Sequence, residues 1–270
     1  MKHIIQIISL ITAKQRREHI SSHFAHLNMP FKFFDAVNKE TLHLVLSKYP
    51  LNFTKDGLTD GEKACFLSHY LLWQRLCASD NNYLIVCEDD VVLSPDVGKL
   101  LESLPAIMQD CDILKFETML RPVVIEPDWQ KTFEGFVLRK LKTENMGTAG
   151  YVVSKDMACH LVNFFKDAHI HQPIDHYLFR DFLSMDKKIY QTVPAFAIQD
   201  DVLNSDKNHL RSDLHDERIK RRNNKRLHSN KLIREFLRLF QPFNARYRKE
   251  KRDDRLIINY GQIIIFKTDD

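Results

Sequence analysis

The sequence predicts an α/β protein with a mostly parallel sheet flanked by helices on both faces. Short apolar segments alternate with helical patterns between positions 2 and 200, and the run Tyr83–Cys87 is wholly apolar. Such a run is typical of a strand that is buried on both faces. The length of 270 residues, with 44% hydrophobic and 28% charged residues, suits one large soluble domain with a small appendage.

The first elements follow from local periodicity. Lys2–Leu10 is apolar with polar interruptions and is expected to be a buried strand rather than a signal peptide. A helix is expected from Thr12, with Gln15 at capping-box spacing. Its apolar residues recur on one face, and they are Ile20, Phe24 and Leu27.

Three further elements are expected between the first helix and the apolar run Tyr83–Cys87. Phe31–Ala36 is expected to be the second strand and Lys39–Lys48 a short helix. The pair Asp60-Gly61 is a turn signal, and a long, largely apolar helix is expected over Glu62–Ala78. Asn81-Asn82 then breaks the chain before the buried strand.

The remaining elements continue the alternation. The expected helices are Asp96–Met108, a helix after Ser154 that ends near Lys166, and a helix after Pro173; the expected strands are Asp112–Phe116, Ala149–Val153 and Ile189–Val193. Ser154 is expected to be an N-cap. Because ligands gather at the carboxyl ends of parallel strands, the site is expected there.

The C-terminal part differs in charge, which divides the chain into a catalytic domain (1–200) and a basic appendage (201–270). Lys231–Phe240 is expected to be an amphipathic helix. Its apolar face suits either an anionic membrane surface or the catalytic domain itself. Nucleic-acid binding is not expected, because no recognition motif accompanies the charge.

The five cysteines and the absence of long apolar runs indicate in which cellular compartment the protein is expected. The cysteine number is odd and no pair has zinc-knuckle spacing, so we expect reduced, buried side chains and no structural zinc. No apolar run approaches the ~18 residues of a membrane-spanning helix. A cytoplasmic protein is expected, with peripheral contact to the inner face of the cytoplasmic membrane left open.

The strand Tyr83–Cys87 ends in three carboxylates, Glu88-Asp89-Asp90. Their mutual repulsion favours a positive partner, and Mn²⁺ or Mg²⁺ prefers oxygen ligands. Alternate residues of an extended chain point the same way, so Glu88 and Asp90 are the expected metal ligands. Asp89 faces elsewhere and is a candidate for the turn or the ribose. The alternative is an acidic loop that caps the following helix.

Several segments match a known pattern in order and spacing. They are Ile7-Ile8-Ser9-Leu10 with Arg16-Arg17, Gly61–His69, Leu84–Val91, Gly147–Tyr151, Pro173-Ile174-Asp175 and Gln199. Over residues 4 to about 205 the chain thus resembles glycosyltransferase family 25, the bacterial lipooligosaccharide galactosyltransferases and their collagen-modifying relatives. Lys63-Ala64 departs from the Ile-Gly that is usual before the cysteine.

This resemblance implies a GT-A-like, Rossmann-like fold and transfer of a hexose with inversion. It implies UDP-galactose as the donor, a lipooligosaccharide glycan as the acceptor, and the acidic triplet as the DxD-type metal motif. Two other functions stay open from the residues alone. They are a metal-dependent phosphohydrolase, which the glutamate directly after the strand disfavours, and a catalytically inactive module that binds membrane surfaces.

Two carboxylates are candidates for the catalytic base. The resemblance places Asp175 near the acceptor, whereas its position before a helix also suits an N-cap. Glu62 competes with it, or else it favours the N-terminal dipole of its helix. His69 lies on the same helix face as Glu62 and is a candidate donor contact, with a buried histidine bonded to backbone as the alternative.

The other candidates for donor binding lie at strand ends. They are Ser9, Leu10, Thr12, Arg16, Asp35, Ala36, Asp89, Thr148, Ala149, Gly150 and Gln199. Small residues at 148–150 allow close backbone approach to a sugar, or simply a tight entry into a strand. Arg16 suits the diphosphate, or else it is a solvated helix residue, and Gln199 suits the metal or phosphate, or else it is a satisfied amide.

Overall fold

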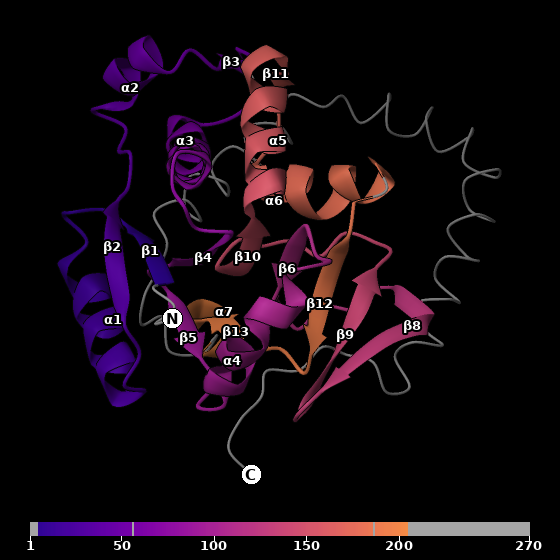
Figure 1. The fold of residues 1–270 in the computed structure, drawn as a ribbon. Coiled ribbons are helices and arrows are strands. Elements are labelled where there is room, and N and C mark those ends of the chain that lie inside the picture. Colours follow the sequence, from indigo (N-terminus) through magenta and orange to yellow (C-terminus); the bar gives the residue numbers. More distant parts are fainter. Residues whose placement is uncertain (1–4, 56, 186, 205–270) are drawn as a thin grey trace, which may run out of the picture.

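The computed structural model describes residues 5–55, 57–185 and 187–204. They form an α/β fold around an eight-stranded sheet with the order β2-β1-β4-β10-β6-β12-β9-β8 (Figure 1). The strands are β2 (Phe31–Asp35), β1 (Ile5–Ser9), β4 (Tyr83–Glu88), β10 (Gly150–Ser154), β6 (Ile113–Lys115), β12 (Ile189–Val193), β9 (Phe136–Leu141) and β8 (Ile125–Phe133).

Most strands of this sheet run in one direction. β1 is parallel to both β2 and β4, and β12 is parallel to β6. β10 is inserted antiparallel between β4 and β6, and β9 pairs antiparallel with β12 and β8. β10 and β9 therefore run against the other strands, and the expected mostly parallel α/β architecture is confirmed.

Helices cover both faces of the sheet. α3 (Asp60–Cys77) and α5 (Lys155–Asp167) pack in one hydrophobic core, whereas α1 (Lys14–His26) and α4 (Val97–Ile107) pack in the other. Successive residues of a strand point to opposite faces, and the apolar strand 83–87 accordingly supplies side chains to both cores. This burial on both faces explains why the strand lacks polar alternation.

Helix caps only partly follow the prediction. Ser154 accepts a hydrogen bond from the Met157 amide (3.1 Å), as expected. The capping box expected at Thr12 was wrong, because α1 begins at Lys14 after Ala13 and has no side-chain cap. Residues 11 and 12 form a turn before the helix, so Thr12 lies too early to cap it.

Short elements surround the edge of the sheet where β4 ends. β13 (Ala197–Gln199) pairs with β5 (Val91–Leu93) and β7 (Glu117–Thr118), and α7 (Asp200–Leu203) follows β13. Elsewhere are α2 (Leu42–Lys48) and the parallel pair β3 (Asn52–Phe53) and β11 (His169–Ile170). The helix expected after Pro173 is in fact short α6 (Ile174–His176), continued by a π-helical turn and a 3₁₀ turn.

The prediction that all cysteines are reduced was wrong for two of the five. Cys77 and Cys159 form a disulfide between α3 and α5, across 82 positions of sequence. Helix packing brings them together, and no local spacing indicates that. Cys65, Cys87 and Cys111 lie outside any disulfide.

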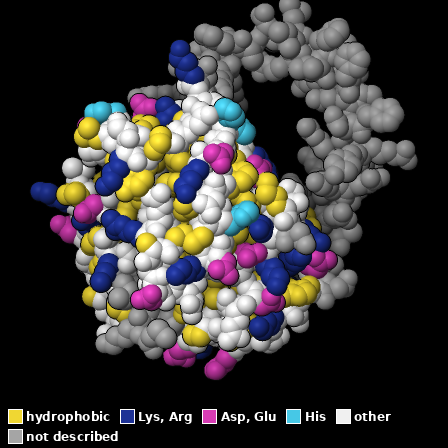
Figure 2. Space-filling view, turned by 45° about the horizontal axis from the view of Figure 1, so that its top comes forward, with side chains coloured by type: hydrophobic (Ala, Val, Ile, Leu, Met, Phe, Trp, Pro, Cys, Tyr) yellow, Lys and Arg dark blue, Asp and Glu magenta, His cyan; other side chains and the backbone are white. Residues whose placement is uncertain are grey.

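The surface bears on the expected partners. Basic and acidic side chains are interspersed on the face shown in Figure 2, so the described residues present no continuous basic patch there. No helix among the described residues combines the length and the hydropathy needed to cross a membrane. The amphipathic helix expected at Lys231–Phe240, and the appendage beyond residue 204, lie outside the described residues.

Candidate active site

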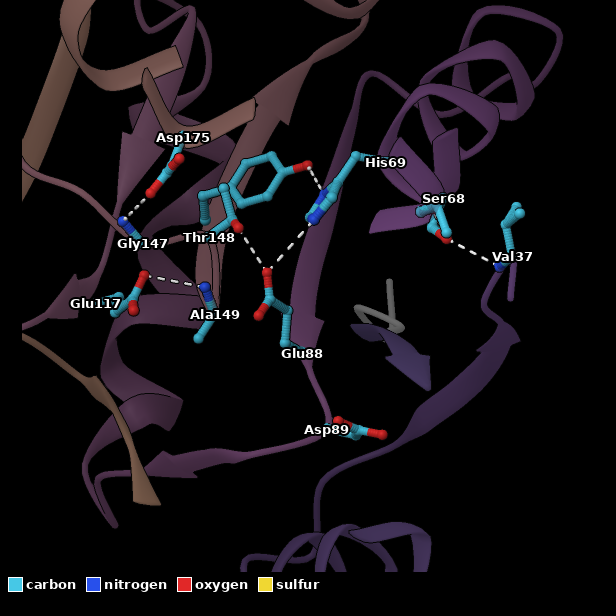
Figure 3. A network of polar contacts seen from close by, with 12 residues as sticks. Val37, Ser68, His69, Glu88, Asp89, Glu117, Gly147, Thr148, Ala149 and Asp175 are labelled. Carbon is cyan, nitrogen blue, oxygen red and sulfur yellow. Dashed lines mark hydrogen bonds and ion pairs between the residues drawn. The ribbon is translucent and has the colours of Figure 1, made fainter. Parts of the chain in front are cut away.

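The three consecutive carboxylates lie at the carboxyl end of β4, where the central sheet passes into the β5–β13–β7 sheet. Glu88 is the last residue of β4, and Asp89 and Asp90 form the turn before β5. Their side chains have different partners, and Figure 3 shows Glu88 and Asp89 pointing apart. The acidic turn, residues 88–90, therefore holds three distinct environments.

Asp89 is an ion-paired carboxylate. It accepts hydrogen bonds from the Ser9 hydroxyl (2.7 Å) and the Arg16 guanidinium (2.8 Å). Burial lowers the pKa of Arg16, but the charges of Asp89 and Asp90 outweigh it and raise that pKa. The structure thus brings together Ser9, Arg16 and Asp89.

Sequence reasoning missed a second arginine beside this pair. Arg17 donates to the backbone carbonyls of Ser9 and Leu10, each at 3.0 Å, and to the Asp35 carboxylate (2.5 Å). It thereby joins the ends of β1 and β2. The Ala36 amide donates to the Ser9 carbonyl (2.9 Å), whereas Thr12 is exposed in the turn before α1.

Asp90 is buried, with only 6% of its surface exposed. Its Oδ1 has no hydrogen-bond partner among the described residues. Burial, and then the negative charge of Glu88, raise the pKa of Asp90 well above its ordinary range. A buried carboxylate oxygen without a partner is costly unless the group takes up a proton or a cation.

β13 brings further polar groups to this turn. Gln199 lies opposite Val91 in the β13–β5 register, and the Asp200 amide donates to the Asp90 carbonyl (2.8 Å). The Asp200 carboxylate is itself buried, and its Oδ2 lacks a hydrogen-bond partner within the described residues. The sequence signal for Asp200 was its place directly after Gln199, at the end of a strand.

Glu88 lies between a loop and helix α3. Its Oε1 accepts a hydrogen bond from the Thr148 hydroxyl (2.5 Å) and is 3.5 Å from Nε2 of His69 (Figure 3). Nδ1 of His69 is 2.8 Å from the Tyr151 hydroxyl, and that hydroxyl accepts a hydrogen bond from Trp73 Nε1 (3.1 Å). His69 is therefore held by a side chain rather than by the backbone.

A buried ion pair holds the loop that carries Thr148, which begins at Gly147 and leads into β10. Lys115 Nζ contacts Glu117 Oε2 (2.8 Å) and the Gly147 carbonyl (2.5 Å), and both charged side chains are fully buried. Glu117 also accepts from the Ala149 amide (3.0 Å). Gly147 has a φ of +99°, and a Cβ there would lie 2.5 Å from Glu117 Oε1. Sequence reasoning missed both Lys115 and Glu117.

The two candidate bases differ in their surroundings. Asp175 accepts from the Gly147 amide (3.2 Å) and the His176 amide (3.0 Å), so it joins the same loop to the start of α6. Glu62 is buried and completes a capping box with Thr59, accepting from the Thr59 amide (2.9 Å). The Glu62 carboxylate therefore serves the start of α3, the alternative that the sequence left open.

The comparisons with known proteins agree with one another. The family model described as "Glycosyltransferase family 25 (LPS biosynthesis protein)" matches residues 2–178. The chain is 37% identical to the lipooligosaccharide biosynthesis protein lic2B of Haemophilus influenzae, over 81% of this chain and 84% of the relative. It is 32% identical to the lacto-N-neotetraose biosynthesis glycosyltransferase LgtE of Neisseria meningitidis serogroup B, over 72% and 73%.

A solved glycosyltransferase involved in glycosylation of the major capsid of PBCV-1 aligns with a TM-score of 0.40 and 8% identity, covering 73% of this chain and 93% of that chain. A likeness at this level carries no functional weight. The family model covers well over half of the residues, and its span includes the acidic turn, the 147–150 loop and Asp175. The chain is a member of glycosyltransferase family 25.

Proposed function

We propose that this glycosyltransferase moves galactose from UDP-galactose onto a lipooligosaccharide glycan, with inversion at the anomeric carbon and with a divalent cation. The names of the relatives in lipooligosaccharide biosynthesis support the acceptor class. The galactosyl donor and the inversion rest on the sequence resemblance. The observation that carries the proposal is the acidic turn at the carboxyl end of β4, beside Ser9, Arg16 and the 147–150 loop.

The residues of the acidic turn fit a hard cation. Asp90 is buried with an unpartnered oxygen and a raised pKa, and of the neighbouring charges Glu88 affects that pKa most. These two residues would hold Mn²⁺ or Mg²⁺. Bound there, the ion would neutralise the diphosphate and act as a Lewis acid on the leaving group.

The remaining side chains would bind and orient the donor. Arg16, held by Asp89, supplies positive charge for the diphosphate, and Ser9, Leu10, Asp35 and Ala36 at the ends of β1 and β2 would contact the nucleoside. Residues 148–150 suit the sugar because small side chains allow close backbone approach. His69 and Gln199 flank the acidic turn from α3 and β13.

Inversion needs one base and no covalent intermediate. The acceptor hydroxyl oxygen bonds to the anomeric carbon as the bond from that carbon to the phosphate oxygen breaks. The electron pair leaves on UDP, and the hydroxyl proton passes to a carboxylate, for which Asp175 is our candidate. The contact of Asp175 with the Gly147 amide ties the candidate base to the loop that carries Thr148.

A donor screen tests this function. The purified chain is given UDP-galactose, UDP-glucose and their N-acetyl forms, with Mn²⁺ or with chelator, with and without truncated lipooligosaccharide. We expect Mn²⁺-dependent turnover of UDP-galactose that Asp90→Asn abolishes. The control Asp96→Asn alters an aspartate that pairs with Lys99 beyond β5 and is expected to retain activity.

Three outcomes contradict the proposal. Equal turnover with chelator refutes the metal role, and no turnover of any nucleotide sugar refutes the donor class. Hydrolysis of simple phosphate esters without a sugar acceptor would favour a phosphohydrolase. The membrane contact of residues 201–270 stays a prediction from the sequence.

A further inference from the structure

A second group of metal-binding atoms lies where helix α3 approaches Glu88. Cys65 and His69 are one helical turn apart on α3, so they share one face. One ligand atom from each, together with a Glu88 oxygen, lies within 4.8 Å of the other two. This group joins α3 to the end of β4.

His69 provides an independent sign that something binds there. Its side chain is fully buried, and its Nε2 has no hydrogen-bond partner among the described residues, although it faces Glu88 Oε1 at 3.5 Å. Nδ1 is held by Tyr151 at 2.8 Å. Histidines that ligate metals characteristically have the other ring nitrogen held by a polar group, which fixes the ring.

The chemistry of the three ligands selects the ion. Mg²⁺ and Mn²⁺ favour oxygen, whereas a set of sulfur, nitrogen and one carboxylate suits Zn²⁺. We propose that Cys65, His69 and Glu88 form a Zn²⁺ site with an open fourth position. It is distinct from the oxygen-ligated site proposed for the donor, but the two share Glu88.

Sharing one carboxylate makes the two ions compete. Zn²⁺ on the α3 side withdraws Glu88 Oε1 from Thr148, which donates to it at 2.5 Å, and from the cation at the acidic turn. Zinc therefore inhibits sugar transfer by occupying Glu88. This consequence rests on the proposed function, whereas the site itself does not.

Binding is tested with Co²⁺, a spectroscopic substitute for Zn²⁺, on the full chain without nucleotide. We expect a thiolate-to-cobalt charge-transfer band that saturates at one equivalent and disappears when Zn²⁺ is added. Cys65→Ser abolishes the band. Cys111→Ser retains it, because Cys111 is buried in the other core. Circular dichroism checks that both variants are folded.

A second variant tests the role of the ring. Tyr151→Phe removes the partner of Nδ1 and is expected to weaken Co²⁺ binding about 10- to 100-fold. No band in the wild-type chain, or a band that survives Cys65→Ser, overturns the site.

Kinetics then separate this inference from the proposed function. At fixed Mn²⁺, Zn²⁺ lowers the transfer rate of the wild-type chain, and Cys65→Ser relieves this inhibition relative to its own Mn²⁺ rate. Inhibition that is unchanged in Cys65→Ser overturns the competition for Glu88. If no nucleotide sugar reacts but the band behaves as expected, the zinc site stands and the transferase proposal fails.

Discussion

Replacing Lys115 by methionine removes the positive half of a buried ion pair and keeps a side chain of similar length. In the wild-type chain Lys115 Nζ contacts Glu117 and the Gly147 carbonyl, and it lies 4.3 Å above the Phe179 ring. Methionine fills the space beside the ring but leaves Glu117 without its cation. Oε1 of Glu117 already lacks a hydrogen-bond partner in the described residues.

The expected loss of stability follows from the burial of both partners. Breaking a fully buried pair by removing one member costs up to about 3–5 kcal/mol where the other member stays charged, which for Glu117 means above about pH 7. At ~1.4 kcal/mol per factor of ten, this lowers the folding equilibrium constant by roughly two to three and a half orders of magnitude. The substitution also removes the contact of Lys115 with the Gly147 carbonyl. Because this contact holds the loop 147–149, Thr148 should move away from Glu88, and the rate of sugar transfer should fall.

The loss should depend on pH, in a direction that the structure sets. Burial raises the pKa of Glu117 to about 7, and the charge of Lys115 keeps it from rising further. A carboxyl whose pKa is raised by folding contributes its full stabilisation below the pKa that it has in the unfolded chain. This contribution is lost as the pH rises through the folded-state pKa of about 7. Without Lys115 the pKa rises further, so Lys115→Met costs more near pH 8 than near pH 6, by about 1–2 kcal/mol.

Urea unfolding near both pH values measures these differences. The control Lys142→Met removes a lysine from a half-exposed pair with Glu126 and is expected to cost about 0–1 kcal/mol at either pH. A Lys115→Met loss below ~1 kcal/mol near pH 8, or one that shrinks as the pH rises, would refute the reasoning. Either result would mean that water reaches Glu117.

Three further substitutions test the site and its support. Gly147→Ala places a Cβ 2.5 Å from a buried carboxylate oxygen at a φ of +99°, so calorimetry should show a loss of about 1–3 kcal/mol; Gly98→Ala, whose nearest atom is 3.9 Å away, should show none. Thr148→Val removes the hydroxyl that bonds Glu88 and should lower kcat/KM about tenfold, with Thr148→Ser restoring it. Ser154→Ala removes the N-cap of α5 and should cost about 1 kcal/mol in urea unfolding; no change would contradict the capping role.

Local patterns predicted most elements of the fold. The apolar run 83–87 and the long helix α3 both lie where the sequence indicated, because burial imposes their composition. The β8–β9 hairpin was missed. Ile125–Phe133 contains Pro127 and mixed polar residues, so it lacks the alternation that predicts a strand. The direction of β10 was also unpredictable, because connections rather than composition set it.

The sequence predicted those residues of the candidate site that lie at the ends of strands. Ser9 ends β1 and Asp89 follows the neighbouring parallel strand β4, and the structure joins them at 2.7 Å. Lys115 and Glu117 were missed because charged residues are normally assumed to face solvent. The available signal was their place within the apolar stretch Ile113–Phe116 and just after it, where a lysine must find a buried partner.

The adjacent aspartates of the acidic turn should respond in opposite ways to the same substitution by asparagine. Asp89→Asn removes the partner of Arg16 and should lower stability by about 1.5–3 kcal/mol. Burial and then Glu88 raise the pKa of Asp90, so its stabilising contribution is lost as the pH rises through that raised value. Above the unfolded pKa, folding must either protonate this carboxyl or bury its charge, and both cost stability. Asp90→Asn should therefore raise stability, by about 0.5–2 kcal/mol, while it abolishes sugar transfer. Thermal unfolding without divalent ions would decide the matter: if Asp90→Asn destabilises the chain as Asp89→Asn does, Asp90 already has a partner in the fold and is not held ready for a cation.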